Sequence, residues 1–177
     1  MDKTILGATL IILFAGYWEY VVVAVILGYL LWVPKPERRE RALAIGLAIL
    51  SAAITRFIIV NVIRFLYYRP RPFVAETFTP LLDHAANASF PSGHAAFFMA
   101  LAVYVLLVGR KKLGWFLFSS AVLIGLARVA GGIHWPSDIL AGWLVGAAVS
   151  FVIWYGEKHL RRRGGIGIRA GLKNPWE

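Results

Sequence analysis

Three short polar stretches contain the residues whose types and spacing could carry out chemistry. Their sequences are RFLYYRPRP at 64–72, FPSGHA at 90–95 and ARVAGGIHWPSD at 127–138, and each adjoins a long apolar run. Charged groups at the ends of hydrophobic segments cost little free energy if those ends meet in water on one side of a membrane. The pattern therefore predicts one polar site, built from three helix ends around a shared anion.

Arginine in the first stretch is typical of an anion site. Arg64, Arg69 and Arg71 lie within eight residues, and each offers a planar fork of N–H donors, which matches a phosphate group and stays protonated at neutral pH. Arginines at the ends of membrane spans also extend their charge into the interface without binding a ligand. The first stretch alone therefore leaves both interpretations open.

The second stretch predicts the start of a helix. Pro91 suits the first helical position, and Ser92, Gly93 and His94 follow in the first turn. The free amides of such a turn attract an anion, glycine lets the anion approach the backbone, and Ser92 adds a hydroxyl. His94 would stand beside the anion with a reference pKa of about 6.5, which suits proton donation near neutral pH. A helix-capping turn with an incidental histidine would have the same sequence.

The third stretch pairs a histidine with a carboxylate. His134 and Asp138 are four residues apart with Pro136 between them, so Asp138 falls in the first turn of the last expected helix. A carboxylate that contacts one ring nitrogen fixes the tautomer and makes the other nitrogen a better nucleophile. Arg128 adds a guanidinium from the preceding helix, and such arginines would repel a metal ion held by His94, His134 and Asp138. The combined set predicts metal-independent phosphoryl transfer through a phosphohistidine, with no cofactor.

Composition predicts a single-domain integral membrane protein over residues 1–177, with its motif core at 64–138. Of the 177 residues 59% are hydrophobic and 16% are charged, and the net charge of +10 comes in short clusters between apolar runs. This distribution fits a membrane topology better than a nucleic-acid partner. The sequence contains no cysteine, which excludes disulfides and zinc–thiolate sites. It does not indicate an oligomeric state.

Hydropathy predicts an all-α bundle of about five transmembrane helices. Residues 4–33 are almost continuously apolar, and a helix of that length, about 45 Å at 1.5 Å per residue, is too long for one span and too short for two. We expect one span at 16–33, preceded by a short interfacial helix at 4–15, for which a cleaved signal peptide is the alternative. The remaining expected spans are 42–66, 92–109, 114–131 and 137–157.

Basic connections predict the orientation in the cell membrane. The segments 34–41, 110–112 and 158–163 are rich in lysine and arginine, and they alternate with the motif-bearing segments. By the positive-inside rule these connections and the C-terminus are cytoplasmic, and the motifs are extracytoplasmic, on the periplasmic side where one exists. Arg56 lies inside the second expected span and needs a polar partner. Glu19 lies at a similar depth and could form that ion pair, or it could simply sit at the interface.

The three stretches resemble the three-part motif of the type-2 phosphatidic acid phosphatase superfamily, which includes membrane lipid phosphatases and soluble vanadium haloperoxidases. Residue types, order and spacing match: Arg64 x6 Arg71 Pro72, then Pro91 Ser92 Gly93 His94, then Arg128 x5 His134 x3 Asp138. Two positions depart from the usual pattern. Arg64 stands where the family usually has lysine, and Ala127 stands where it commonly has serine.

The resemblance implies a role for each motif residue. His134 would be the nucleophile, Asp138 its partner, and His94 the general acid on the leaving group and later the base for water. The phosphoryl oxygens would be held by Arg64, Arg71, Ser92, Arg128 and the amide of Gly93.

The segment 69–94 also resembles bacterial undecaprenyl-diphosphate phosphatases, which remove the terminal phosphate of a carrier lipid outside the cytoplasm. Gly93 departs from many of those relatives, which have aspartate there. Phosphatidylglycerophosphate, phosphatidate and lipid A remain alternative substrates. A haloperoxidase fits the apolar spans poorly, and a catalytically silent lipid-binding or transport protein would keep the anion site without turnover. Glu76, Asp83 and His84 could contact a headgroup, but solvated loop positions are the better explanation for them.

Overall fold

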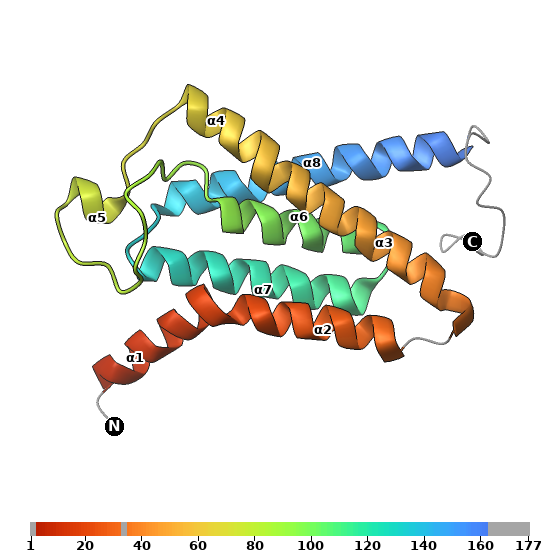
Figure 1. The fold of residues 1–177 in the computed structure, drawn as a ribbon, viewed down its shortest axis with the longest axis horizontal. Coiled ribbons are helices and arrows are strands. Elements are labelled where there is room, and N and C mark those ends of the chain that lie inside the picture. The colour runs from red at the N-terminus through yellow and green to blue at the C-terminus, as the bar shows by residue number, and fades with distance from the viewer. Residues whose placement is uncertain (1–2, 33–34, 163–177) are drawn as a thin grey trace.

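The structure, a computed structural model, describes residues 3–32 and 35–162, and the regular elements in these ranges are all helices. Figure 1 shows long helices running roughly side by side, with the connecting loops at the two ends of the bundle. The expected all-α bundle is confirmed. The Gly-rich C-terminal tail, 163–177, which was expected to be cytoplasmic, lies outside the described residues.

The N-terminal apolar run forms one uninterrupted helix. α1 (Lys3–Ile12) continues through the π-helical segment η1 (Leu13–Tyr17) into α2 (Trp18–Trp32). The expected boundary between a short helix and a span falls inside η1, where the helix bends instead of ending (Figure 1). The run contains no proline that would stop a helix, and a π-helical turn accommodates a change of direction without breaking the chain of hydrogen bonds.

The other spans lie close to their expected positions. The second is a continuous helix made of α3 (Lys35–Ala53), the π-helical segment η2 (Ile54–Ile59) and α4 (Val60–Leu66). The short helix α5 spans Pro72–Ala75, and the remaining helices are α6 (Gly93–Leu107), α7 (Lys111–Ala130) and α8 (Pro136–Arg162). Among the described residues, four helices are long and apolar enough to cross a membrane: Thr4–Trp32, Glu37–Leu66, Lys111–Ala130 and Pro136–Leu160. The apolar helix α6 is shorter, with 15 residues.

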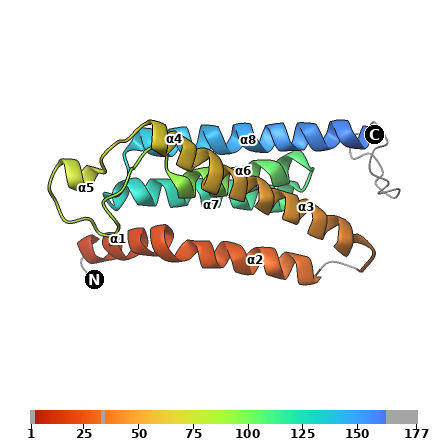
Figure 2. The ribbon, with the colours of Figure 1, turned by 45° about the horizontal axis from the view of Figure 1, so that its top comes forward.

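The helix α6 is the centre of the bundle. Ten of its 15 residues are buried, so it presents almost no face to the surroundings. It packs against α8, α7 and α3. In Figure 2, α6 and α7 lie between α8 on one side and the N-terminal helix on the other.

Close backbone contact holds α8 against α6. A side chain at Gly142 would place its Cβ 2.7 Å from the Ser92 carbonyl oxygen, and one at Gly146 would collide with the Ala96 carbonyl oxygen. Glycine at both positions lets the two helices touch. Further along, the Ser150 hydroxyl donates to the Ala100 carbonyl at 2.6 Å. The N-terminal ends of α6 and α8 are thereby fixed beside each other.

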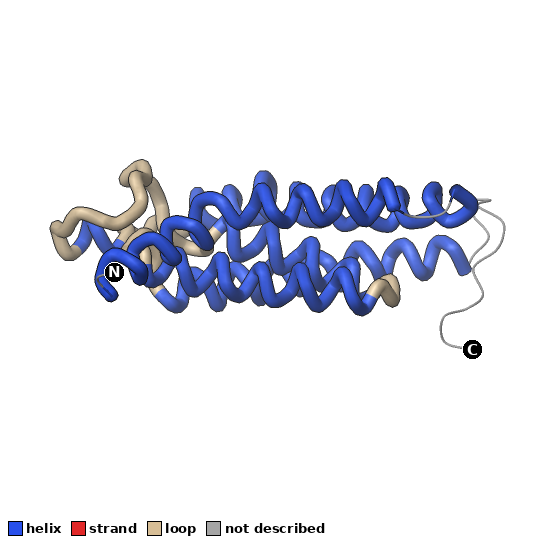
Figure 3. The backbone as a smooth tube through the Cα atoms, turned by 90° about the horizontal axis from the view of Figure 1, so that it is seen from below, coloured by secondary structure: helices blue, strands red, loops and turns tan. Residues whose placement is uncertain are grey.

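The two ends of the bundle differ in composition. Most of the loop structure gathers at one end, together with α5 and the N-terminal ends of α6 and α8 (Figure 3). The basic N-terminal ends of α3 and α7 and the C-terminal end of α8 lie at the opposite end (Figure 1). The fold therefore separates the motif-bearing segments from the basic connections, as the alternation along the sequence predicts.

Candidate active site

Direct hydrogen bonds join the three motif segments at one end of the bundle. From the end of α4, Arg64 Nη2 donates to the Pro91 carbonyl at 2.9 Å, and its Nε donates to the same oxygen at 3.3 Å. The Ser92 amide donates to the Asp138 carbonyl at 2.9 Å. Segments that are far apart in the sequence are thus brought to one place, as predicted.

The predicted histidine–carboxylate pair forms at the start of α8. His134 Nδ1 lies 3.4 Å from Asp138 Oδ2, and both side chains are almost completely buried. An Nδ1 proton shared with the carboxylate leaves Nε2 with its lone pair free to accept a bond. Nε2 faces away from Asp138, toward the guanidinium of Arg71 at 3.2 Å.

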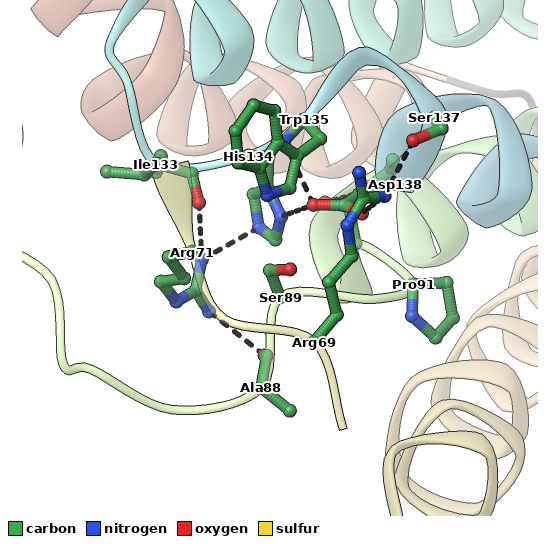
Figure 4. A network of polar contacts seen from close by, with 12 residues as sticks. Arg69, Arg71, Ala88, Ser89, Pro91, Ile133, His134, Trp135, Ser137 and Asp138 are labelled. Carbon is green, nitrogen blue, oxygen red and sulfur yellow. Dashed lines mark hydrogen bonds and ion pairs between the residues drawn. The ribbon is translucent and has the colours of Figure 1, made fainter. Parts of the chain in front are cut away.

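Asp138 is held by two partners besides the histidine. Its Oδ2 accepts a hydrogen bond from the Trp135 amide at 2.9 Å, and its Oδ1 accepts one from Arg69 Nη1 at 2.9 Å. Arg69 also donates to the Ser137 hydroxyl at 2.7 Å and lies over the Trp135 ring. Figure 4 shows this network around His134. The carboxylate is therefore fixed from both sides, which fixes the imidazole in turn.

Arg69 lies in the basic cluster of the first stretch, but the three-part motif predicts roles only for Arg64 and Arg71. The repeat RPRP was the only local signal. The structure gives Arg69 the carboxylate of Asp138, 69 positions away, as its ion-pair partner.

Arg71 is the most completely enclosed arginine of the site, with 1% of its surface exposed. Its Nη1 donates to the Ile133 carbonyl at 2.7 Å, and its Nη2 donates to Asn87 Oδ1 at 2.8 Å. Burial, and then repulsion by Arg64, lower the pKa of Arg71 to about 10, so the guanidinium stays charged at neutral pH. Asn87, which the sequence analysis missed, orients this charge.

The environment of His134 favours the neutral imidazole. Burial is the main cause that lowers its pKa, to about 4, and the nearby Arg71 and Arg128 lower it further. The hydrogen bond to Asp138 opposes these effects without cancelling them. In this tautomer the Nε2 lone pair accepts from Arg71 Nη1. Once a bound phosphate takes up that guanidinium, the neutral ring can attack the phosphorus atom.

The second motif forms a capped helix start, as predicted. Ser92 is the N-cap of α6, and its hydroxyl accepts a hydrogen bond from the Ala95 amide at 3.5 Å. Gly93 begins the helix, and its missing side chain leaves space that the guanidinium of Arg56 fills. The Ser92 hydroxyl, expected on the anion, serves the helix cap in this structure.

The predicted ion pair between Glu19 and Arg56 does not form; the ion pairs found within 3–32 and 35–162 place Glu19 elsewhere. Glu19 Oε2 lies 3.6 Å from Nε2 of His94, and each of these side chains is about one-third exposed. Glu19 contacts the first turn of α6 instead. His94 therefore has a carboxylate neighbour from the first span.

Arg128 reaches the site from the end of α7. It is 5% exposed, and its Nη2 donates to the Ala15 carbonyl at 3.0 Å, inside the π-helical segment η1. Its Nε is buried without a hydrogen-bond partner among the described residues. The N-terminal helix thus positions this guanidinium, which keeps an N–H donor that no hydrogen bond among the described residues uses.

Among the three loop residues considered as headgroup contacts, only His84 lies close to the site. Its ring centre is 6.4 Å from that of His134. Burial lowers the pKa of His84, with smaller contributions from the arginines. Glu76 and Asp83 are exposed. Within 3–32 and 35–162, no three His, Cys, Asp or Glu side chains come together as metal ligands.

A family comparison identifies the helical core. The sequence model of the PAP2 superfamily matches residues 41–162, which include all three motifs. The resemblance predicted from the sequence is confirmed.

Individual relatives agree with the family match. "Undecaprenyl-diphosphatase BcrC" of Bacillus subtilis is 34% identical over 138 residues, which cover 77% of this chain and 69% of the relative. The crystal structure of Aquifex aeolicus LpxE superimposes with a TM-score of 0.62 at 23% identity, over 88% of each chain. A transmembrane PAP2-type phosphatidylglycerolphosphate phosphatase from Bacillus subtilis gives a TM-score of 0.59 at 21% identity, over 92% of this chain and 81% of the other.

Proposed function

The chain belongs to the PAP2 superfamily, and we propose that it is a lipid phosphatase that removes the terminal phosphate of undecaprenyl diphosphate through a phosphohistidine on His134. One observation carries this proposal. A buried, neutral imidazole, held at Nδ1 by Asp138, presents its Nε2 toward Arg71, where a phosphate would bind.

The first half-reaction forms the phosphohistidine. Nε2 of His134 attacks the terminal phosphorus, and the bond from phosphorus to the bridging oxygen breaks. His94 donates a proton to that leaving oxygen, which departs with the lipid. Asp138 stabilises the positive charge that the imidazole acquires.

The second half-reaction releases phosphate. His94, now neutral, takes a proton from a water molecule, whose oxygen attacks the phosphohistidine. The bond between phosphorus and Nε2 breaks, and His134 returns to its neutral form with inorganic phosphate as product.

The anion-binding groups stabilise the charge on the phosphoryl oxygens in both transition states. Arg71 and Arg128 are buried guanidiniums directed to the region around His134. Arg64 uses two nitrogens on the Pro91 carbonyl, so we assign it to the edge of the site. The Gly93 amide and the Ser92 hydroxyl complete the set at the start of α6, once the hydroxyl turns from its capping bond.

Support for undecaprenyl diphosphate comes from the Bacillus subtilis relative named for that activity. Phosphatidylglycerophosphate is the competing substrate, because a structural neighbour carries that name at lower identity. Phosphatidate and lipid A have the same kind of phosphomonoester group. All of these lipids fit a site at the end of a membrane bundle.

A phosphate-release assay tests the proposal. Purified protein in detergent with EDTA is given undecaprenyl diphosphate, phosphatidylglycerophosphate or phosphatidate, with His134→Ala as the control. We expect the highest kcat/KM for the polyprenyl diphosphate, and none for His134→Ala. A higher kcat/KM for a glycerophospholipid would overturn the substrate assignment. Strong inhibition by EDTA would overturn the metal-independent mechanism, and no release from any lipid would favour a silent binding protein.

We also propose that the motif end of the bundle is extracytoplasmic and the basic end cytoplasmic. The sequence has no cysteine, so single cysteines can serve as probes without background. Glu76 in the motif-end loop and Lys112 at the start of α7 are both exposed. In intact cells, an impermeant maleimide should label Glu76→Cys and not Lys112→Cys; the reverse pattern would invert the proposed topology.

A further inference from the structure

Arg56 lies at the site without belonging to any of the three motifs. It is in η2, inside the second membrane helix, and its guanidinium packs against the backbone of Gly93. A Cβ added to Gly93 would stand 2.5 Å from Arg56 Nε and 2.7 Å from its Cζ. The side chain therefore occupies the space beside the first turn of α6, next to His94.

No carboxylate of the described segments compensates this charge. Glu19, the expected partner, pairs with His94, and the aromatic ring nearest to the Arg56 guanidinium is that of Phe57, at 5.6 Å. A guanidinium inside an apolar span is costly unless an anion or a polar cavity accompanies it. The position of Arg56 is thus explained by an anion that arrives with the substrate.

Charge balance favours more than one phosphate. The guanidiniums of Arg56, Arg64, Arg71 and Arg128 interact electrostatically with one another or with the site histidines. Asp138 is paired with Arg69, and Glu19, which lies beside His94, is the other carboxylate that interacts with these groups. The four guanidiniums carry +4, and the carboxylate of Glu19 reduces this to a net charge of +3. A phosphomonoester carries only about −1.5 to −2 at neutral pH. A diphosphate adds negative charge and matches the excess.

The depth of Arg56 indicates which phosphate it contacts. Arg56 precedes Arg64 by eight residues on one continuous helix, about 12 Å deeper at 1.5 Å per residue. Arg64 reaches Pro91, and Arg56 reaches Gly93, further along the same chain into α6. A lipid with its hydrocarbon chain in the membrane places its lipid-linked phosphate on the deeper side of the phosphate that is removed.

We propose that Arg56 binds the phosphate that stays on the lipid, and so makes the site selective for diphosphates over monophosphates. This subsite deepens the proposed function and rests on it. A side chain at position 93 would occupy the space that the Arg56 guanidinium fills in this chain. The leaving group is then a lipid monophosphate whose negative charge Arg56 stabilises.

Two substitutions at position 56 distinguish the effect of losing the positive charge from the effect of changing the shape of the side chain. Arg56→Met removes the guanidinium and keeps a long apolar stem, whereas Arg56→Lys keeps the positive charge in the span and serves as the folding reference. Arg39→Met, an exposed arginine near the start of α3, is the matched control for loss of one arginine. All variants are compared by thermal unfolding in detergent before they are assayed.

Binding tests the subsite without relying on turnover. We measure the Kd of methylenediphosphonate and of inorganic phosphate for the wild-type protein and each variant. Arg56→Met should weaken methylenediphosphonate binding by about 10- to 100-fold, the loss expected for a hydrogen bond to a charged group, and leave phosphate binding nearly unchanged. Equal weakening of both ligands, or of neither, would overturn the subsite.

Turnover then distinguishes the subsite from the proposed function. With polyprenyl monophosphate and diphosphate of the same chain length, the ratio of kcat/KM values for diphosphate over monophosphate should fall about 10-fold or more in Arg56→Met. An unchanged ratio in an active enzyme would overturn the subsite alone. A wild-type protein that prefers methylenediphosphonate but hydrolyses neither lipid would overturn the proposed function and keep the subsite.

Discussion

Replacing Arg69 with methionine should slow the chemical step and leave substrate binding nearly unchanged. Arg69 contacts the carboxylate that orients the nucleophile, through Nη1 at 2.9 Å from Asp138 Oδ1, and its neighbouring contacts are Ser137 and Trp135. The substitution therefore removes a restraint on Asp138, while the anion-binding arginines keep their places. We expect the effect in kcat and little effect in KM.

The magnitude follows from the burial of the two partners. The Asp138 side chain is 0% exposed and that of Arg69 is 29% exposed. A hydrogen bond to a charged group contributes about 1.5 to 3 kcal/mol, and solvent near Arg69 reduces this to about 1 to 2 kcal/mol. If that energy is lost from the transition state, kcat falls about 5- to 30-fold. Arg69→Lys should recover part of the loss, because an ammonium group keeps the charge but lacks the guanidinium fork.

The assay is a double-mutant cycle on kcat with Arg69→Met and Asp138→Asn. The asparagine has no charge for Arg69 to restrain, so Arg69→Met should cost less than about 3-fold in the Asp138→Asn background. Arg39→Met is again the control. An equal fold loss in both backgrounds would refute the reasoning, because Arg69 would then act independently of Asp138.

Three further predictions concern other parts of the molecule. Burial lowers the pKa of His134 to about 4, so its NMR titration should stay flat from pH 8 to about 5. The imidazole of the unfolded chain binds its proton near pH 6.5, so the stability that the neutral His134 ring contributes to the folded protein is complete above pH 6.5 and is lost as the pH falls toward 4. A titration midpoint near pH 6.5 in the folded protein would contradict this. Glu19→Gln should lower kcat/KM, because it removes the carboxylate that lies 3.6 Å from Nε2 of His94, and an unchanged kcat/KM would exclude a role for this contact. Gly146→Val should lower the unfolding temperature by about 2 to 12 °C, because the valine Cβ would collide with the Ala96 carbonyl oxygen. An unchanged unfolding temperature would mean that α6 and α8 can move apart at little cost in free energy.

Much of the site was predictable because its geometry is local. The four-residue spacing of His134 and Asp138 across a helix start places the two side chains together in any such turn, and the structure has them 3.4 Å apart. The capping role of the second motif is local in the same way. Hydropathy located the spans because each apolar run ends at charged residues or at proline.

Contacts between distant segments were harder to predict, because hydropathy reports depth and not the direction of a side chain around its helix axis. Glu19 follows one π-helical segment, and Arg56 lies inside another. A π-helical turn holds an additional residue and rotates the face that follows it. Both charges reach the first turn of α6, Glu19 beside His94 and Arg56 beside Gly93, without forming an ion pair with each other.

Detection of the phosphohistidine tests the central claim most directly. The protein is mixed with undecaprenyl diphosphate labelled with ³²P in its terminal phosphate, quenched in alkali, where phosphohistidine persists, and digested for peptide mapping. We predict label on His134 and none in His134→Ala. Label on another residue, or full turnover by His134→Ala, would contradict the account.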